Sequence, residues 1–442
     1  MNLPAAKTNA IILCADIGTS SLKAAFIDTG GKLFAFSRKA YAGAAPDCWR
    51  AAFFGALESI ASQCPGRADA VVISGNGPTL VPVLADGTSA APLYWFSVLG
   101  KAKAENGKVG NSKGFSVGPS LFLPNVLACK NHDPETFKKT KLFLSSQEWL
   151  SFSLGADPVT VLSQEAYRPF YWDEQQCEKA GLGMETFPPF TPMGSVIGGV
   201  RASAGVPASV QTVLPEGTPI LAGGPDFIMA LLGSAVIEPG MICDRAGSSE
   251  GINLCVDKTG FDRIRGISAE AGIRLLPHAR KGLFNAGVVI SESGFLFEKY
   301  RRDSGQADKP YGVLMEEIAA DKTHPARAVL DVMAFQVKAA LEKLHDTGLT
   351  PDSVQMVVSG GQAKSPRWNA MKAKKTGAVL LVPEIPDGEL VGDAVLGALY
   401  LEAVRGRAGT PVRGDPPGVF PDPERLIESA RRMVRIKERY EP

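Results

Sequence analysis

Two stretches far apart in the chain carry nearly the same pattern. LCADIGTSS at residues 13–21 aligns with ICDRAGSSE at residues 242–250, and a second apolar run follows each of them. A repeat placed near the start of each half indicates two similar domains. Each domain would open with a hairpin whose turn carries a glycine and hydroxyl groups. We expect the domains to be residues 1–222 and 223–442, with both turns facing a shared cleft.

Composition narrows the class of protein. The 442 residues exceed what one core usually supports, and 45% hydrophobic with 21% charged residues is ordinary for a globular protein. The formal net charge of +1 gives no bulk electrostatic reason to expect nucleic acid or a membrane as a partner. No run of about 18 apolar residues occurs, and the first residues lack the pattern of a signal peptide.

The seven cysteines are scattered, and none forms a C-x-x-C pair. This spacing excludes the zinc motif found in some sugar kinases and repressors. It favours reduced thiols over a disulfide framework, and so a cytoplasmic protein.

The runs between turns predict an α/β protein. We expect strands at residues 10–16, 22–28, 32–41, 70–75, 353–361 and 378–383, and helices at 49–63, 134–154, 326–346, 365–377, 390–404 and 424–440. The first three strands form an antiparallel meander, and the later alternation is typical of a parallel sheet. Residues 100–120 are predicted to be an exposed connection, and residues 408–423 a Pro/Gly linker.

The DIGTSS turn has the composition of a phosphate loop. Gly18 lets the backbone approach a ligand, and Thr19 and Ser20 supply hydroxyl and N–H donors. A carboxylate at Asp16 would repel phosphate unless a cation lay between them, which implies Mg²⁺. The alternative is an ordinary turn closed by its own polar side chains.

A second stretch, AGGPDFIMALLG, joins a predicted strand to a helix that opens on Pro225. Proline suits the first turn of a helix, and Asp226 would complement the helix dipole there. The pair Gly223–Gly224 is not needed for a cap. It would let a substrate approach Asp226 closely.

A third stretch, VVSGGQAKSPRWNAM, runs from a strand through Gly360–Gly361 into a helix that starts at Ser365–Pro366. Exposed N–H groups at such a helix start suit a nucleotide. An ordinary strand-to-helix turn would have the same residues.

Together these stretches resemble the FGGY family of carbohydrate kinases, xylulokinases among them, within the actin, Hsp70 and hexokinase superfamily. DIGTSSLKAAFID resembles the first phosphate loop, and GGPDFIMALLGSAVIEPGMICDRAGSSEG resembles the catalytic-aspartate helix and second phosphate hairpin. VVSGGQAKSPRWNAM, continued by LVGDAVLGA, resembles the adenosine motif, and VFPDPERLIESARRMVRIKERY resembles the C-terminal tail. The resemblance implies an α/β fold with two ribonuclease H-like domains of the actin and hexokinase type around a central cleft. It also implies ATP and Mg²⁺ as cofactors.

The resemblance assigns roles to single residues. Asp226 corresponds to the general base and Asp16 to the acid associated with the metal. The nucleotide-binding residues implied in this way are Gly18, Thr19 and Ser20 in the first loop, Gly247, Ser248 and Ser249 in the second hairpin, and Gly360, Gly361 and Gln362 at the adenosine. Residues 73–87 correspond to a strand and loop that help hold the sugar, with Asn76 and Gly77 as the nearest candidates for contact.

Two departures from the family bear on the substrate. The family usually has Trp-x-Asp-x-Arg where this chain has YWFSVL at residues 94–99, so the tryptophan remains and the acid and the arginine do not. The usual Pro-Tyr-Leu…Gly-Glu-Arg segment is reduced to DKPYGVLMEEIAADKTHP.

We therefore expect an ATP-dependent kinase of a small sugar or polyol, a ketose such as xylulose by family base rate. The alternative is a sugar-binding regulatory or scaffold protein of the same fold with weak or no kinase activity. A chaperone-like nucleotide switch is disfavoured, because no residues remain for a client domain. The oligomeric state, a homodimer included, is left open.

Overall fold

The computed structural model describes residues 9–64, 66–94, 119–247, 250–290, 293–406 and 420–442. The chain divides into two compact units. Unit 1 is Met1–Met229 with Asp393–Ser429, and unit 2 is Ala230–Gly392 with Ala430–Pro442. The boundaries expected from sequence, 1–222 and 223–442, thus differ from the observed division in placing residues 223–229, Asp226 among them, and residues 393–429 with the C-terminal part of the chain.

A six-stranded sheet forms the centre of unit 1, in the order β3-β2-β1-β4-β10-β9. Its strands are β1 (Ile11–Ile17), β2 (Ser21–Asp28), β3 (Leu33–Ala40), β4 (Ala70–Gly75), β9 (Val196–Gly199) and β10 (Pro219–Leu221). β1 and β2 are almost entirely buried, which their near-continuous apolar sequences explain. The expected antiparallel meander of the first three strands is confirmed.

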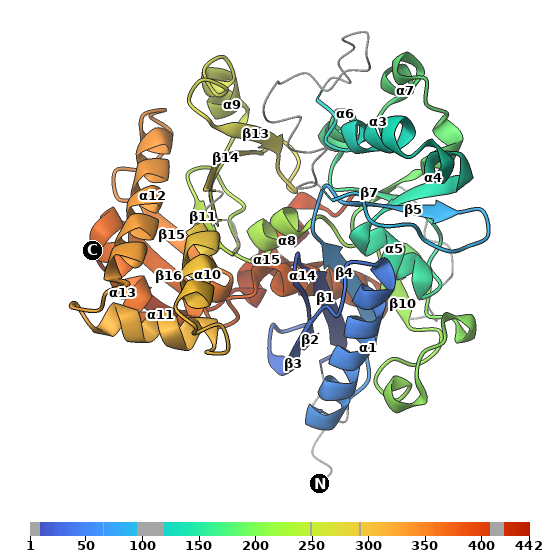
Figure 1. The fold of residues 1–442 in the computed structure, drawn as a ribbon, viewed down its shortest axis with the longest axis horizontal. Coiled ribbons are helices and arrows are strands. Elements are labelled where there is room, and N and C mark those ends of the chain that lie inside the picture. The colour runs from blue at the N-terminus through green and yellow to red at the C-terminus, as the bar shows by residue number, and fades with distance from the viewer. Residues whose placement is uncertain (1–8, 65, 95–118, 248–249, 291–292, 407–419) are drawn as a thin grey trace. The chain divides into compact units, whose positions relative to one another are not determined.

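Helices cover this sheet. α1 (Pro46–Gln63) lies along β2 and β3, as Figure 1 shows, and buries Trp49, Phe53, Leu57 and Ile60. α14 (Gly388–Gly406) packs on β1 so closely that a side chain added at Gly397 would lie 2.6 Å from Ile12 Cγ2. This contact gives a physical reason why residues 393–429 belong to unit 1.

The rest of unit 1 consists of short elements. These are β5 (Leu80–Leu84), α3 (Leu123–His132), α4 (Pro134–Lys139), β6 (Thr140–Ser145), α5 (Ser146–Ser153), β7 (Thr160–Leu162), α6 (Arg168–Tyr171), α7 (Glu174–Ala180) and β8 (Phe190–Pro192). The helix expected at 134–154 is wrong over its middle third. The run TKLFLS extends as β6 and pairs with β5, and a capping box at Ser145 then starts α5.

Unit 2 has a seven-stranded sheet in the order β13-β14-β12-β11-β15-β16-β17. Its strands are β11 (Ile242–Ala246), β12 (Glu250–Val256), β13 (Arg274–Pro277), β14 (Phe284–Ile290), β15 (Gln355–Ser359), β16 (Val379–Pro383) and β17 (Ile436–Tyr440). The helix predicted for residues 424–440 ends early. α15 (Pro423–Met433) stops before the alternating segment IKERY, which pairs with β16 as an edge strand.

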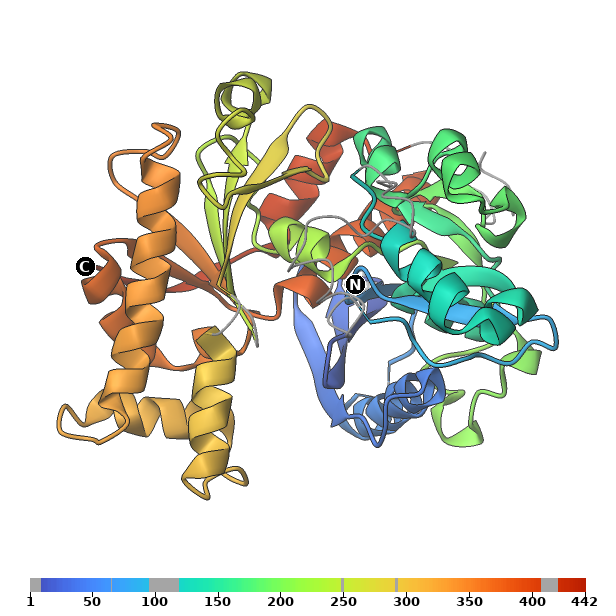
Figure 2. The same ribbon diagram turned by 45° about the horizontal axis from the view of Figure 1, so that its top comes forward.

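The helices of unit 2 pack in two layers. They are α9 (Lys258–Ile264), α10 (Ser293–Asp303), α11 (Tyr311–Ala320), α12 (Arg327–His345) and α13 (Pro366–Thr376). One face of α12 joins the sheet core through Val337, Leu341 and Leu344, and the orange α12 stands beside these strands in Figure 2. A second core, with Phe297, Leu314, Met333 and Trp368, forms between α10, α11, α12 and α13.

The two sheets repeat one topology. β3, β2, β1, β4, β10 and β9 correspond in order and direction to β14, β12, β11, β15, β16 and β17. In both sheets two antiparallel pairings are followed by two parallel ones and a final antiparallel edge. The echo between residues 13–21 and 242–250 therefore marks equivalent hairpins, and the expected pair of ribonuclease H-like domains is confirmed.

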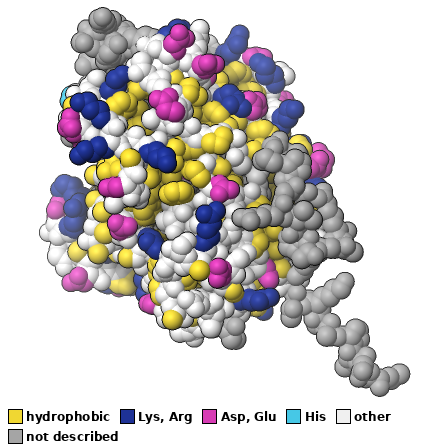
Figure 3. Space-filling model, turned by 90° about the vertical axis from the view of Figure 1, so that its right-hand side faces the viewer, with side chains coloured by type: hydrophobic (Ala, Val, Ile, Leu, Met, Phe, Trp, Pro, Cys, Tyr) yellow, Lys and Arg dark blue, Asp and Glu magenta, His cyan; other side chains and the backbone are white. Residues whose placement is uncertain are grey.

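Some expectations fall outside the described residues, including most of the 100–120 connection and of the 408–423 linker. Within the part of the chain that is described, no helix is both long and apolar enough to cross a membrane. All seven cysteines are described, and none is in a disulfide. On the face shown in Figure 3, acidic and basic side chains are intermixed among apolar ones.

Candidate active site

The carboxyl ends of three neighbouring strands bring the predicted residues of unit 1 together. β1 pairs in parallel with β4, and Asp16 lies opposite Ser74 in that ladder. β4 pairs in parallel with β10, and beyond it Gly75 forms a parallel bridge with Pro225. Asp16, Asn76 and Asp226 therefore lie along one edge of the sheet, where ligands of open α/β sheets usually bind.

Asp16 is buried and paired. Its Oδ2 atom lies 3.2 Å from Lys23 Nζ, which reaches across from the opposite position on β2. The turn that follows is closed by a hydrogen bond from Gly18 N to Ser21 O at 3.1 Å, and its Thr19 and Ser20 are exposed. The turn thus offers hydroxyl groups to solvent while a buried ion pair holds its base.

Tyr41 supports the same turn. Its hydroxyl donates to Gly18 O at 3.1 Å, and its backbone N–H donates to Ser20 O at 3.2 Å. Burial raises the pKa of Tyr41 well above its usual range, and the nearby Asp16 carboxylate adds to the effect. The phenol therefore remains a hydrogen-bond donor at neutral pH.

The donor set at this edge fits Mg²⁺ that arrives on phosphate. A buried carboxylate is a hard oxygen ligand, and Mg²⁺ often takes one or two carboxylates together with substrate phosphates. In the described segments, no three His, Cys, Asp or Glu side chains are grouped to hold a metal by themselves. Asp16 could contribute one ligand to an ion whose other ligands are phosphate and water.

Asn76, which follows β4 at this edge, has a buried amide. Its side chain is 3% exposed, and neither Oδ1 nor Nδ2 has a hydrogen-bond partner. Its backbone is fixed, because its N–H donates to Ile17 O at 2.8 Å and its carbonyl accepts from Ser146 Oγ at 3.2 Å. A buried amide without partners costs free energy, which a polar ligand would recover. Gly77 follows in a cis peptide bond with Pro78.

Asp226 begins α8 (Asp226–Leu232), one residue later than expected, because Pro225 takes part in the bridge to Gly75. The side chain of Asp226 is partly exposed, and its Oδ1 accepts the N–H of Phe227 at 2.6 Å. Packing, rather than access for a substrate, accounts for Gly223. A Cβ at that residue would lie 2.0 Å from Ile73 O.

Sequence reasoning missed two charged residues at this edge. Lys23 pairs with Asp16, and Asp393 of α14 accepts a hydrogen bond from Ser74 Oγ at 3.0 Å. The alternation of side chains along β2 could have identified Lys23, since Ser21 and Lys23 share a face. Asp393 interrupts an apolar helix, and it lies in the stretch LVGDAVLGA that the resemblance includes without assigning this residue a role.

In unit 2, Gly247 is exposed at the end of β11, whereas Ser248 and Ser249 lie outside the described residues. Arg245 occupies the position that Asp16 has in unit 1. The second hairpin therefore does not repeat the carboxylate at the strand end.

The turn after β15 carries the predicted adenosine residues. Gly360 has φ of +92°, and a Cβ there would lie 2.5 Å from Ala246 O, so only glycine fits between this turn and β11. Gly361 has open space where its side chain would be. Gln362 is buried, its Oε1 accepts from Trp368 Nε1 at 3.1 Å, and its Nε2 has no hydrogen-bond partner.

The start of α13 differs from expectation. Glu316 Oε2 on α11 accepts from Ser365 Oγ at 2.6 Å and from Arg367 N at 3.0 Å. A carboxylate of the chain itself therefore occupies the helix start that we expected to bind a nucleotide. One of the N–H groups expected to be exposed here, that of Arg367, is therefore capped by a neighbouring helix.

A cavity of about 420 Å³ lies beside the same turn, between α11 and the turn that holds Gly361 and Lys364. Its lining consists of Pro310, Gly312, Val313, Glu316, Glu317 and Lys364. The ammonium of Lys364 is 2.8 Å from Asp387 Oδ2, which fixes one wall. The volume is in the usual range for a small ligand.

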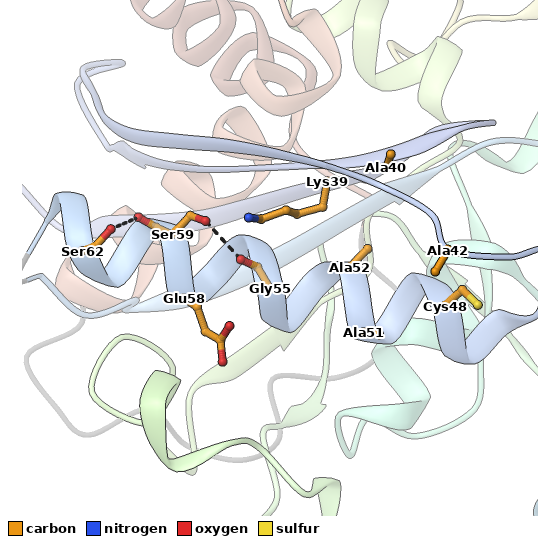
Figure 4. A pocket seen from close by; sticks show the side chains of 10 residues that line it. All are labelled: Lys39, Ala40, Ala42, Cys48, Ala51, Ala52, Gly55, Glu58, Ser59 and Ser62. Atoms are coloured by element: carbon orange, nitrogen blue, oxygen red, sulfur yellow. Dashed lines mark hydrogen bonds between the residues drawn. The ribbon is translucent and has the colours of Figure 1, made fainter. Parts of the chain in front are cut away.

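A larger hollow, of about 500 Å³, lies between β3 and α1 of unit 1 (Figure 4). Lys39 extends over the small residues Ala52, Gly55 and Ser59 of α1, and none of the predicted site residues lines it. This hollow is distinct from the strand edge that carries Asp16 and Asp226.

Residues 312–401 match the profile of the FGGY family of carbohydrate kinases, C-terminal domain. The matched segment is similar to that family. It includes α12, β15, the Gly360–Gly361 turn, α13, β16 and most of α14.

Curated relatives are similar to the chain at low identity. A xylulose kinase of Bacillus subtilis is 23% identical over 319 residues, which cover 62% of this chain and 61% of the relative. An autoinducer-2 kinase of Salmonella typhimurium is 22% identical over 379 residues, covering 72% of this chain and 65% of the relative. The chain thus spans less than two thirds of the length of these relatives.

Solved structures share the fold over nearly the whole chain. A ligand-bound xylulose kinase from Lactobacillus acidophilus has a TM-score of 0.73 at 17% identity, covering 98% of this chain and 94% of its own. A Plasmodium falciparum glycerol kinase with ADP has a TM-score of 0.68 at 14% identity, with the same coverage. These likenesses confirm the actin and hexokinase type of fold.

Proposed function

We propose that this chain transfers the γ-phosphoryl group of ATP to a hydroxyl of a small sugar or polyol, a ketose such as xylulose. The observation that carries the proposal is the gathering of Asp16, Asn76 and Asp226 along one edge of the unit 1 sheet. Such a transfer needs an acid beside the phosphates, a polar group that holds the sugar and a carboxylate that acts as base. Asp16, Asn76 and Asp226 would supply these in turn. The FGGY segment and the kinases similar to the chain support it.

Asp226 acts as the general base in this proposal. The attacking hydroxyl must point in line with the γ-phosphate, and its proton must leave as the new bond forms. A partly exposed carboxylate at the start of α8 can accept that hydrogen bond and then the proton. Its hydrogen bond from Phe227 N holds the carboxylate in place.

Asn76 orients the sugar. Its buried amide offers one acceptor and two donor hydrogens, which suits adjacent hydroxyl groups of a polyol. Gly77 lies next to it and supplies no side chain that would fill the space.

Nucleotide binding is divided among the turns. Gly18, Thr19 and Ser20 of unit 1 and Gly247 of unit 2 are assigned to phosphates. The turn Gly360–Gln362 is assigned to the adenosine, and the 420 Å³ cavity beside it has a volume suited to that group. Mg²⁺ bound to ATP would neutralise phosphate charge. Asp16 would hold it, with Lys23 keeping this carboxylate oriented.

A substrate panel tests the proposal. We expect ADP release from ATP and Mg²⁺ to rise well above the sugar-free rate with at least one of xylulose, gluconate, glycerol and other small polyols. A folded protein that binds a panel sugar without accelerated ADP release would favour the regulatory or scaffold alternative. No response to any sugar, in a protein that also fails to bind ATP, would contradict both readings.

A further inference from the structure

A fully buried ammonium joins the two strands of the second hairpin. Lys372 of α13 has no exposed side-chain surface, and its Nζ lies 2.6 Å from Asp244 Oδ2 on β11 and 2.6 Å from Glu250 Oε1 on β12. Both carboxylates are also completely buried. Asp244 precedes the turn that begins at Gly247, and Glu250 follows it. The Lys372 side chain therefore links β11 to β12 close to this turn.

The network has further contacts. Ser293 Oγ of α10 donates to the other oxygen of Glu250. The Trp368 ring lies 5.2 Å from Lys372 Nζ. Tyr311 of α11 is close enough for the Glu250 charge to raise its pKa, although burial contributes more. Side chains from three helices and two strands therefore take part in this buried network.

The charges nearly cancel. Burial, and then the neighbouring Glu250 carboxylate, raise the pKa of Asp244 well above its usual range. For Glu250, burial again acts to raise the pKa and is the largest single cause, but the Lys372 charge together with hydrogen bonds to Asp244, Lys372 and Ser293 lowers the pKa overall. Lys372 thus faces two carboxyl groups, and a proton favours Asp244 over Glu250, which brings the buried charges toward the balance that a closed apolar site tolerates.

Burying these charged groups costs desolvation free energy, so the network is a poor way to stabilise a core. Apolar side chains of similar volume usually serve as well or better, so buried ion pairs are better explained by the geometry they specify. Here that geometry involves two predicted nucleotide elements. α13 follows directly from the adenosine turn, and Gly360 of that turn lies against Ala246 of β11.

We propose that Lys372 is a positioning residue for nucleotide binding. By bridging Asp244 and Glu250 it holds the second phosphate hairpin in fixed register with the adenosine turn, so that both meet one nucleotide. The inference rests on the proposed function, since it needs a nucleotide at these two elements.

The test uses ADP and ATP binding by isothermal titration, together with steady-state KM values. Lys372→Met alone leaves an unpaired buried carboxylate, so the decisive variant is Glu250→Gln with Lys372→Met. That double variant keeps volume, leaves a neutral network and retains a partner for Ser293. Lys375→Met is the matched control, because Lys375 lies on the same helix with a half-exposed ion pair to Asp331.

We expect the folded double variant to bind ADP about tenfold or more weakly, the scale of a lost charge-assisted contact. KM for ATP should rise while KM for the sugar stays within twofold, and the control should match wild type. ADP binding by the folded double variant within twofold of wild type would overturn the inference alone. Wild type that binds neither ADP nor ATP would overturn the proposed function, and the inference with it.

Discussion

The β1–β2 hairpin of unit 1 and the β11–β12 hairpin of unit 2 occupy equivalent positions in their sheets. They differ in where their charged side chains lie. In unit 1 Asp16 is the next-to-last residue of β1, and its ion pair with Lys23 lies beside an exposed turn. In unit 2 the acid is one position earlier in the aligned pattern, at Asp244. It points inward to a fully buried Lys372.

The turn of the second hairpin is also one residue shorter. Ile17 and Leu22 are the last pair before the first turn, whereas Ala246 and Glu250 are the last pair before the second, which encloses one residue fewer. The same hairpin fold thus carries two different arrangements of charge. In unit 1 a carboxylate lies near the carboxyl end of β1, and in unit 2 two carboxyl groups pair with Lys372 inside the core.

The largest expected effect on stability tests how closely the adenosine turn sits on the second hairpin. Gly360→Ala places a methyl group 2.5 Å from Ala246 O at a positive φ. We expect it to cost about 3 kcal/mol of unfolding free energy, from overpacking and backbone strain combined. Gly361→Ala is the control, with nothing within 4 Å of its Cβ, and should change stability by less than about 0.5 kcal/mol. Similar denaturation midpoints for the two variants would show that the turn and β11 are not in tight contact.

Low pH should destabilise unit 2 through the buried His278. His278 Nε2 donates to Val236 O at 2.8 Å, its Nδ1 accepts from Arg280 N at 3.1 Å, and burial lowers its pKa to about 4 from 6.5. The folded state therefore resists protonation, and stability present above pH 6.5 is lost as the pH falls toward 4. Between pH 7 and pH 5 this should remove about 2 kcal/mol.

The measurement is chemical denaturation of wild type and His278→Gln at both pH values. The stability difference between them should shift by about that amount in favour of the variant at pH 5. If the stability difference between wild type and variant does not change with pH, the His278 imidazole is solvated in the folded protein. Its pKa would then not be lowered by burial.

The smallest of these effects concerns the first hairpin. Asp16→Asn keeps the side-chain shape and removes the charge that would hold Mg²⁺-ATP. We expect ATP affinity in Mg²⁺ to fall on the order of tenfold, and affinity in EDTA to change little. Glu58→Gln, a surface change on α1 next to β3, serves as the control. An equal loss with and without Mg²⁺ would assign Asp16 to holding the turn through Lys23 instead.

Local patterns were enough to predict much of the fold. The three strands of the first meander, α12 and the repeat of the hairpin follow from apolar runs and turn residues that interact with near neighbours. The repeat of residues 13–21 at 242–250 even anticipated the matching sheets. Two short segments were misassigned, because β6 and β17 exist only through pairing with β5 and β16.

The missing site residues have distant partners. Lys372 meets Asp244, Ser74 meets Asp393, and Glu316 caps the start of α13, and each pair is far apart in sequence. The residues around Lys372 and Glu316 do not distinguish these side chains from surface charges, and Asp393 is marked only by its place in an apolar helix. The glycine pair before Asp226 shows the reverse error, since Gly223 is required by contact with Ile73 O and not by a substrate.

Steady-state kinetics of Asp226→Asn test the central claim most directly. The substitution keeps the shape of the side chain and removes the base, and general-base catalysis is typically worth about 10²–10⁴ in rate. We predict a loss of that size in turnover on the sugar that the panel identifies, with ATP affinity nearly unchanged and the protein folded. If Asp226 only complements the helix dipole, the change would cost about 0.3–1 kcal/mol of stability and leave turnover within a few-fold of wild type. That second result would remove Asp226 as the base and contradict the account.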